Sequence, residues 1–264
     1  MVVTTGLKGQ RVLVTAASQG IGYGAAQAFL GEGARVVINS SNSDNLAKAQ
    51  QSLSQFGEVH SVAADLTVGE DIDNLVTKTV GLLGGLDTLI YVTGSPKPGT
   101  MMEQDYGTWE SAARLLTISP SYLAKKVAEV MISQNVKGRI VLSASDAIRE
   151  PEPNLALSNV CRISIFGIVR TLARELGAHG IRVNAVLPGT INTGRIDQLV
   201  QDISKRNNVP EAMVMSKMVS QIPLGYIGSV EEMSKAFLYL GSEMSSYVSG
   251  AVLPVDGAML RSIG

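Results

Sequence analysis

The sequence lacks a cysteine pair, an excess of charge and a long apolar run. Cys161 is the only cysteine, which excludes an intramolecular disulfide and is typical of a reducing, cytoplasmic compartment. The formal net charge is −1, whereas nucleic-acid binders neutralise phosphates with an excess of lysine and arginine. No apolar run reaches the ~18–20 residues of a membrane span. We therefore expect a cytoplasmic protein that binds a small molecule, and neither nucleic acid nor a membrane.

Short β-branched runs alternate with longer helical patterns along the chain. The predicted strands cover residues 11–15, 35–39, 59–66, 86–94, 138–145, 181–189 and 251–255. Strands separated by long helices indicate right-handed crossovers and a parallel sheet that is covered on both faces. No linker or shift in composition divides the chain. The sequence thus predicts an α/β protein, a single doubly wound Rossmann-type domain over residues 1–264 with seven parallel strands.

Two helical segments depart from this alternation. The helix expected over residues 109–134 contains Pro120, which predicts either a kink or a helix boundary at that point. Residues 194–228 are Met-rich and helical and have no strand of their own. In such a fold we expect them to form a lid over the substrate, and an apolar lid suits an acyl or aliphatic substrate.

Two glycines, one residue apart, follow the first predicted strand in TAASQGIG, residues 15–22. Gly20 lets the backbone approach a phosphate, and Gly22 lets the next helix pack tightly on the sheet. Free N–H groups at the positive end of that helix then face a pyrophosphate. A structural turn alone explains the same pair of glycines, but their place after the first strand favours a dinucleotide site.

Over nearly its whole length the chain resembles the short-chain dehydrogenase/reductase family, in its 3-oxoacyl-(acyl-carrier-protein) reductase-like branch. TAASQGIG is similar to the family's TGxxxGIG, with Ala16 for the first glycine, and PGTINT at 188–193 is similar to PGxxxT. GAVLPVDGAM at 250–259 resembles the closing strand, which usually belongs to a tetramer interface. The resemblance implies an NAD(P)(H)-dependent oxidoreductase for a carbonyl or secondary alcohol, with a 3-oxoacyl or sugar-like substrate, and a homotetramer or dimer.

The resemblance also implies which residues bind the cofactor. Asp65 matches the aspartate that holds the adenine amino group, and Thr193 lies in the loop that grips the nicotinamide carboxamide. YVTG at 91–94 stands where the family has NNAG, so only Gly94 matches. The predicted cofactor set is Thr15, Ala17, Ser18, Gln19, Gly20, Ile21, Gly22, Ser40, Ser41, Asp65, Leu66, Thr93, Gly94, Arg162, Pro188, Gly189, Ile191 and Thr193. No metal is expected.

The second predicted strand ends without an acidic residue. Asn39-Ser40-Ser41-Asn42 has no carboxylate to bind the ribose hydroxyls of NAD, and it also lacks the arginine or lysine usual for NADP. Hydroxyls and amides can donate to a 2′-phosphate, so we favour NADP over NAD. The alternative is a plain polar turn with a helix cap at residue 43 or 44.

The family's proton-transfer motif is replaced. The resemblance implies an Asn, a Ser, a Tyr and a Lys; GRIV at 138–141 aligns the Asn with Thr117, within two residues, and the Ser with Ser145. The Tyr and Lys positions then hold Ser158 and Arg162, and RTLA at 170–173 supports this alignment from the other side. The predicted catalytic residues are Ser145, Ser158 and Arg162.

These replacements alter the available chemistry. A serine hydroxyl titrates far above the phenol value of ~10 and is too short to reach the same point. Arg162 stays charged at any biological pH, so it can bind ribose hydroxyls and polarise an oxygen but cannot exchange a proton. Ser158 is equally well explained as the N-cap of its helix.

Three hypotheses remain open. In the first, the chain is an oxidoreductase whose proton comes from a bound water or from Tyr91, Tyr122, Asp146, Glu150 or Glu152. In the second, it is a catalytically inactive homologue that binds a nucleotide as a sensor or as an oligomer partner. In the third, it performs non-redox chemistry on an anionic substrate bound by Arg162 and Arg149.

Overall fold

One parallel sheet forms the centre of the molecule in the computed structural model, which describes residues 4–262. Its strands are β1 (Arg11–Val14), β2 (Arg35–Ser40), β3 (Val59–Ala63), β4 (Thr88–Tyr91), β5 (Arg139–Ser143), β6 (Arg182–Pro188) and β7 (Val252–Val255). They lie in the order β3-β2-β1-β4-β5-β6-β7, and every neighbouring pair is parallel. The predicted seven-stranded parallel sheet is confirmed, although β3 and β4 end earlier than expected.

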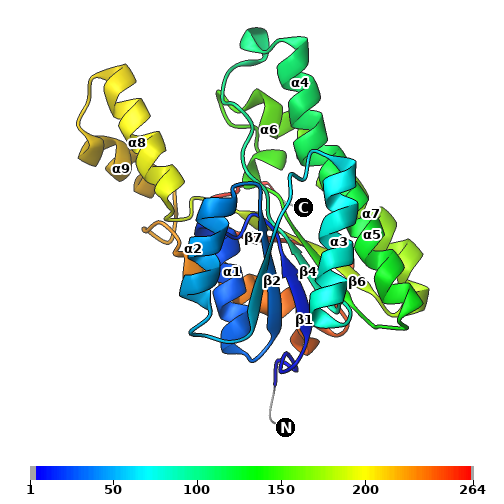
Figure 1. The fold of residues 1–264 in the computed structure, drawn as a ribbon. Helices are drawn as coiled ribbons and strands as arrows, with labels where there is room; N and C mark the ends of the chain where they lie inside the picture. The colour runs from blue at the N-terminus through cyan, green and yellow to red at the C-terminus, as the bar shows by residue number, and fades with distance from the viewer. Residues whose placement is uncertain (1–3, 263–264) are drawn as a thin grey trace.

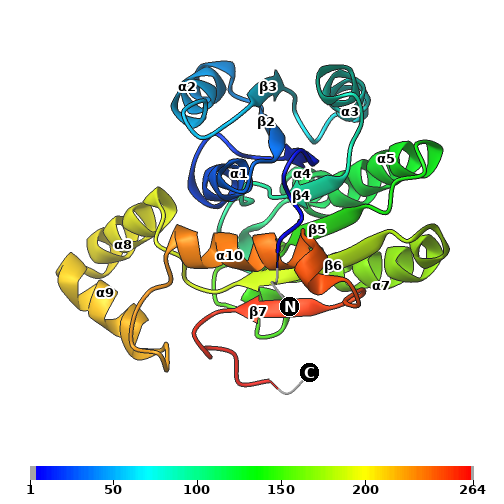
Figure 2. The same ribbon diagram turned by 90° about the horizontal axis from the view of Figure 1, so that it is seen from below.

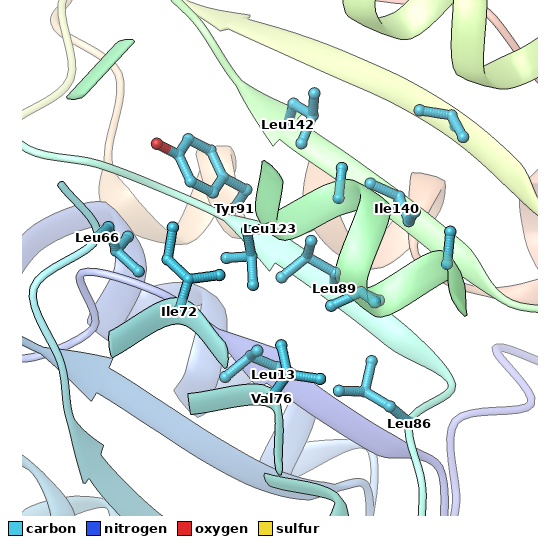
Figure 3. Packing of buried hydrophobic residues seen from close by; sticks show 14 of the residues in the cluster. Leu13, Leu66, Ile72, Val76, Leu86, Leu89, Tyr91, Leu123, Ile140 and Leu142 are labelled. Carbon is cyan, nitrogen blue, oxygen red and sulfur yellow. The ribbon is translucent and has the colours of Figure 1, made fainter. Parts of the chain in front are cut away.

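Helices cover both faces of the sheet (Figure 2). One face carries α1 (Gly20–Gly31), α2 (Ser43–Leu53) and α10 (Val230–Leu240), and the other carries α3 (Gly69–Leu83), α5 (Ser119–Ser133) and α7 (Ser164–Leu176). The strands are therefore apolar on both sides: Leu13 of β1 packs into one core cluster, while Val12 and Val14 pack into the other. Figure 3 shows the first of these clusters, with Leu13 lying near Val76 of α3.

The long helix predicted over residues 109–134 is interrupted. α4 (Tyr106–Ala113) leads into a π-helical turn, Arg114–Ile118, and α5 follows from Ser119. Pro120 has no N–H for the carbonyl four residues earlier, and it occupies the first turn of α5, where proline is tolerated. The α-helical pattern is therefore interrupted just before the proline, at the boundary between the π-helical turn and α5, and a bend of the helix axis stays a prediction.

Two helices stand beyond the sheet at the end toward which the strands run. α8 (Gly194–Asn207) and α9 (Glu211–Ser220) follow β6. Figure 1 shows them apart from the main body, across from α4 and α6 (Ala156–Cys161). Helices were predicted within 194–228, and their role as a lid stays a prediction.

Ala156–His179, which includes α6 and α7, is the one helical stretch among the described residues with the length and hydropathy of a membrane span. α7 packs against β6 and α5 as an outer layer of the sheet. Such a helix is an ordinary part of this fold, so its composition is weak evidence for a membrane.

Candidate functional site

The carboxyl end of β1 is tied to the end of β4 by one buried side chain. Thr15 Oγ1 donates to the Val92 carbonyl at 2.6 Å and accepts from the Val92 N–H at 2.8 Å. The strand order changes direction between β1 and β4, and ligands of open α/β sheets bind at such a point. The buried Ala17 N–H donates to the Asn39 carbonyl at 2.8 Å, which joins the following loop to β2.

The glycine loop leaves the first turn of α1 open. Gly20 has a φ of 58°, and a Cβ on Gly22 would lie 2.5 Å from the Ala16 carbonyl oxygen, so both positions need glycine. Gln19, at the N-cap, makes no side-chain hydrogen bond to the helix, which leaves N–H groups near Ile21 for an anion. Ala16 has a φ of 46°, a strained value for a residue with a Cβ.

In the polar turn after β2, the two serines and the two asparagines have different surroundings. Ser18 Oγ donates to Ser40 Oγ at 3.2 Å, and Ser41 is exposed. The buried Asn39 amide donates to two carbonyls of the β3 region, so it holds strands together. Asn42 caps α2 by accepting from the Asn45 N–H at 2.8 Å. The alternative of a cap at 43 or 44 was wrong by one or two residues, because the amide oxygen of Asn42 reaches that N–H.

The predicted adenine side of the site lies after β3. Asp65 is exposed, and its carboxylate accepts from the N–H and the hydroxyl of Thr67 at 2.9 and 2.8 Å. Its own backbone N–H donates to Asp71 at 2.8 Å. Leu66 is buried in the core, so only its backbone is available to a ligand. Asp65 is thus held at the surface by its own turn.

The PGTINT segment faces the glycine loop. Pro188 ends β6, and Ile191 is buried. Gly189 lies so close to Asp256 that a Cβ there would come within 2.7 Å. Thr193 precedes α8, and its methyl group would lie 3.7 Å from a Cβ on Gly20. The two predicted cofactor-binding segments therefore meet at one end of the sheet.

Ser158 and Arg162 form a buried pair. Arg162 Nε donates to Ser158 Oγ at 3.2 Å, and Arg162 Nη2 donates to the Gly94 carbonyl at 2.9 Å. Each residue is 7% exposed. α6 begins at Ala156, so the N-cap interpretation of Ser158 was wrong: its hydroxyl lies inside the helix and accepts from the guanidinium one turn later.

Burial lowers the pKa of Arg162 to about 10, and Arg195 acts in the same direction while Tyr91 opposes it. The guanidinium therefore stays charged at neutral pH. It lies beside Gly94, which is exposed and follows the half-buried Thr93. The site thus has a fixed positive charge where the family's lysine was expected.

A short contact outside the sheet joins the loop after β4 to the loop before α6. The Gly99 N–H donates to the Asn154 carbonyl at 2.7 Å, and the Ala156 N–H donates to the Gly99 carbonyl at 3.2 Å. Gly99 and Leu155 form an isolated β-bridge. The loop that carries Gly94 and the helix that carries Arg162 are therefore linked twice.

Ser145 lies just beyond β5 and is half-buried. Its hydroxyl donates to Asp146 Oδ1 at 3.0 Å and accepts from the Ala147 N–H at 3.3 Å. Asp146 is 6% exposed. Burial, with a smaller contribution from Asp256, raises the pKa of the Asp146 carboxyl. Since the short helix after β5 (Asp146–Ile148) contacts α6, the same part of the molecule holds Ser145 and Ser158.

The other proposed proton donors lie in different surroundings. Tyr91 is buried, its hydroxyl lies 3.1 Å from the Leu115 carbonyl and 3.0 Å from Ser119 Oγ, and burial raises its pKa. Tyr122 donates to Asp73 at 3.1 Å. These contacts anchor Tyr91 at the π-helical turn and Tyr122 against α3.

Glu150 and Arg149 also have structural partners. The Glu150 carboxylate accepts from the N–H groups of Arg261 and Ser262 at 2.6 and 2.7 Å. Arg149 stacks on Phe166, with 5.9 Å between its guanidinium carbon and the ring centroid. These contacts tie Glu150 to the carboxyl-terminal segment and Arg149 to α7.

Thr117, at the position aligned with the family's Asn, lies in the π-helical turn. Its hydroxyl donates to the Cys161 carbonyl at 3.0 Å and accepts from Ser164 Oγ at 3.2 Å. Cys161 itself is buried. Thr117 therefore joins the interrupted helix to the junction of α6 and α7.

Arg195 was missed by sequence reasoning. It lies in the first turn of α8, where burial lowers its pKa and Glu152 opposes that change. Partial desolvation raises the pKa of Glu152, as does Asp146, while Arg195 lowers it. A signal existed, because Arg195 lies two residues after the PGTINT segment, but its nearness to Glu152 depends on tertiary structure.

Comparison with known proteins decides the family. The family model described as enoyl-(acyl carrier protein) reductase matches residues 15–259. The chain belongs to the short-chain dehydrogenase/reductase family. Within it, glucose 1-dehydrogenase of Gluconobacter oxydans is 31% identical over 95% of this chain and 92% of the relative. The 3-oxoacyl-(acyl-carrier-protein) reductase FabG of Thermotoga maritima is 30% identical over 96% of this chain and 99% of the relative.

A solved structure of the short-chain dehydrogenase/reductase family has nearly the same fold. L-sorbose reductase of Gluconobacter frateurii, in complex with NADPH and L-sorbose, has a TM-score of 0.94 and 28% identity, covering 99% of this chain and 100% of that chain. The predicted family is thus confirmed, and its Rossmann-type fold with it. Members similar to this chain are oxidoreductases for carbonyl and alcohol substrates, which agrees with the coarse prediction of function.

Proposed function

We propose that this short-chain dehydrogenase/reductase is an NADP(H)-dependent oxidoreductase of a sugar-like carbonyl or secondary alcohol, with an atypical proton-transfer site. The proposal is carried by the open first turn of α1 together with the buried Arg162, which donates to the Gly94 carbonyl after β4. Uncapped N–H groups attract a pyrophosphate, and a fixed guanidinium suits ribose hydroxyls and a carbonyl oxygen.

The chain's own residues fit a dinucleotide. Gly20 and Gly22 leave room for close approach of phosphates, and Asp65 is exposed where the adenine is expected. Thr193 and Arg162 complete the nicotinamide end. A bound nicotinamide supplies or accepts the hydride, which no amino-acid side chain can do.

NADP is favoured over NAD because the end of β2 has no carboxylate. Ser40 and Ser41, with Ser18 at 3.2 Å from Ser40, offer hydroxyls to a 2′-phosphate. L-sorbose reductase, of similar fold, is described with NADPH, while a xylitol dehydrogenase with a TM-score of 0.88 is described with NAD+. The serines therefore support the proposed preference for NADP over NAD.

The polar side chains favour a hydroxylated substrate over an acyl chain. Asp146, Glu152 and Arg195 gather near Ser145 and Arg162, and each offers hydrogen bonds that an alkyl chain would leave unmade. Two relatives support this choice, since one is a glucose dehydrogenase and one a sorbose reductase. Ser145 and Ser158 then hold the reacting oxygen, and Arg162 polarises it.

The remaining parts of the proposal concern assembly. Residues 1–264 act as a single domain in which α8 and α9, within 194–228, close over the substrate. The protein works as a homo-oligomer, a tetramer or a dimer, in the cytoplasm. Light scattering of the purified protein tests the assembly, and a monomer at micromolar concentration contradicts it.

Isothermal titration with NADPH and with NADH is the first test. We expect NADPH to bind more tightly, and the absence of binding of either at ~1 mM, the upper end of common KM values, overturns the proposal. The second test follows the loss of absorbance of reduced cofactor with ketoses, aldoses and 3-oxoacyl thioesters. Turnover of sugars supports the proposal; binding without any turnover supports the inactive homologue instead.

A further inference from the structure

A half-buried hydroxyl and a buried carboxyl follow each other directly after β5. Ser145 is half-buried and keeps an accessible side, whereas Asp146 is 6% exposed. Their side chains are joined by a hydrogen bond of 3.0 Å between Ser145 Oγ and Asp146 Oδ1. The Ala147 N–H donates to the same Asp146 oxygen at 2.8 Å and lies 3.3 Å from Ser145 Oγ. A single backbone group thus fixes both partners.

Asp146 has no cationic partner among the residues that the structure describes. It takes part in none of the ion pairs found there. A buried carboxylate without a cation is costly, and such groups take up a proton instead. Burial therefore raises the pKa of the Asp146 carboxyl, although the hydrogen bonds from Ser145 and the Ala147 N–H lower it in part.

We propose that Asp146 and Ser145 form the proton relay of this protein, an inference that rests on the oxidoreductase function proposed above. Ser145 contacts the substrate oxygen, and Asp146 acts through it. The relay replaces the tyrosine that position 158 lacks, from a different element of the fold.

In the direction of reduction, the substrate carbonyl gains one hydride and one proton. A bound reduced nicotinamide would supply the hydride to the carbonyl carbon. The Ser145 hydroxyl, which donates to Asp146 Oδ1 in the free protein, turns in this step to give its proton to the carbonyl oxygen. Ser145 Oγ regains a proton from the Asp146 carboxyl. The products are the alcohol, the oxidised nicotinamide and an Asp146 carboxylate, which takes a proton from solvent before the next turnover.

The alternatives are engaged elsewhere. Ser158 accepts from Arg162, a permanent cation, so it has no acid behind it. Tyr91 and Tyr122 contact the π-helical turn and Asp73. Glu150 binds the backbone near the carboxyl terminus. Asp146 is the acid that shares a hydrogen bond with a predicted catalytic hydroxyl.

The charged groups around Asp146 come from three elements. Asp256, after β7, raises its pKa. Glu152, in the loop before α6, is close enough for Asp146 to raise the Glu152 pKa in turn, while Arg195 of α8 acts on Glu152. Burial and the charge of Asp256 favour the protonated form of Asp146, while the hydrogen bonds from Ser145 and Ala147 oppose it. The net pKa is raised, so reduction should slow as pH rises through the pKa of Asp146.

Infrared spectroscopy of the free protein across a pH series tests the relay without turnover. We expect a protonated carboxyl C=O band that persists above the ordinary aspartate pKa of ~3.9 and vanishes in Asp146→Asn but not in Asp44→Asn, an exposed control on α2. Ser145→Ala should shift this band, because it removes the hydrogen bond. If all carboxyls ionise at ordinary pH, or if the band ignores Ser145→Ala, the relay is wrong.

Kinetics give the second test. Asp146→Asn should lower kcat of reduction at least ~100-fold, in the range of general acid catalysis, remove the loss of rate at high pH, and leave cofactor affinity within about twofold. Asp146→Glu should restore part of the rate. An Asp146→Asn variant with unchanged kcat and pH profile overturns the relay while the oxidoreductase function stands. Failure of the wild type to bind cofactor overturns that function, and the infrared result still judges the Asp146–Ser145 pair.

Discussion

Charged side chains mostly have polar or ionic partners at one end of the parallel sheet, whereas at the other end they form no ion pairs in the described part of the molecule. At the end where strands begin, an arginine opens each of β1, β2, β5 and β6. Arg11 pairs with Asp87 at 2.6 Å, and Arg35 with Glu58 at 2.7 Å. Arg139 pairs with Glu243, and Arg182 donates to Ser245 Oγ at 2.7 Å. Each of these arginines thus donates to a carboxylate or a hydroxyl, although Nε of Arg139 is buried without a partner among the described residues.

At the end where strands finish, charged groups stay apart. Asp146, Glu152, Arg162 and Arg195 form no ion pair with any residue in the described range 4–262. Desolvation raises the pKa of the two acids and lowers that of the two arginines, although Glu152 and Arg195 are exposed. Burial also lowers the pKa of Arg139 and Arg182 at the starting edge, so the two edges differ in the pairing of their charges. The difference teaches that the first edge stabilises the sheet, whereas the second keeps charges available for a ligand.

The largest expected effect concerns the glycine loop at the finishing edge. Gly22→Val places a Cβ about 2.5 Å from the Ala16 carbonyl oxygen, so the loop or α1 must shift away from the phosphate position. We expect at least a ~100-fold loss of NADPH affinity by isothermal titration, about 2.8 kcal/mol. Gly31→Ala, in the same helix with nothing within 4 Å, is the control. Equal affinities for both variants would remove the cofactor from this loop.

At the starting edge, Asp87→Asn should change stability and leave the cofactor site intact. Burial alone raises the pKa of Asp87, but the hydrogen bonds from Arg11 lower it below the ordinary value. Its stabilising effect is therefore present above the unfolded pKa of ~3.9 and is lost as pH falls through the folded pKa.

We expect this variant to lose about 2–3 kcal/mol of unfolding free energy at pH 7, less than the ~3–5 kcal/mol of a fully buried pair, because Arg11 is partly exposed. Between pH 5 and 3 its stability should vary less than that of the wild type, by up to about 1 kcal/mol, because one proton changes stability by at most ~1.4 kcal/mol per pH unit and only below the unfolded pKa of ~3.9. Urea unfolding at each pH measures both. A fall in NADPH affinity beyond twofold would show that the two edges are not independent.

Arg162→Met separates binding from packing at the finishing edge. The change removes the charged hydrogen bonds to Ser158 and to the Gly94 carbonyl, each of a kind that contributes ~1.5–3 kcal/mol. We expect about a tenfold or greater loss of cofactor affinity. Arg149→Met, at a half-buried arginine that stacks on Phe166, should leave affinity unchanged. The hypothesis of an anionic substrate at Arg149 gains support if only the control loses activity.

The smallest effect tests strain in the loop. Ala16→Gly should raise the unfolding free energy by about 0.5–1 kcal/mol, because the ~1–2 kcal/mol cost of a left-handed alanine exceeds the added freedom of the unfolded glycine. Ala17→Gly, where φ is not positive, should be destabilising by a similar amount. Thermal unfolding compares them. If both variants are less stable than the wild type, Ala16 carries no strain.

Backbone-determined features were the most predictable from sequence. The strands follow from apolar runs, and the turn at Gly20 and Gly22 follows from the need for glycine. An interruption near Pro120 was expected because proline lacks an N–H group, whereas the π-helical turn before it was not expected. Such features depend on residues close in the chain, so a single sequence reveals them.

Side-chain partnerships were less predictable. The hydroxyl of Ser158 was equally consistent with a cap, and only the fold brings Arg162 against it and against Gly94. Asp146 was one of several proposed donors, and its raised pKa depends in part on the charge of Asp256, more than a hundred residues away in the chain. Sequence spacing says nothing about such distances.

The β-bridge between Gly99 and Leu155 joins the loop after β4 to the loop before α6. A molecule that displaces either loop on entering must displace both, so access and the alignment of Arg162 change in one motion. Variants that weaken the bridge should therefore alter kcat and KM together, as hinge variants do. We expect a change in this bridge to alter the position of Arg162, which donates to Gly94 in the same loop.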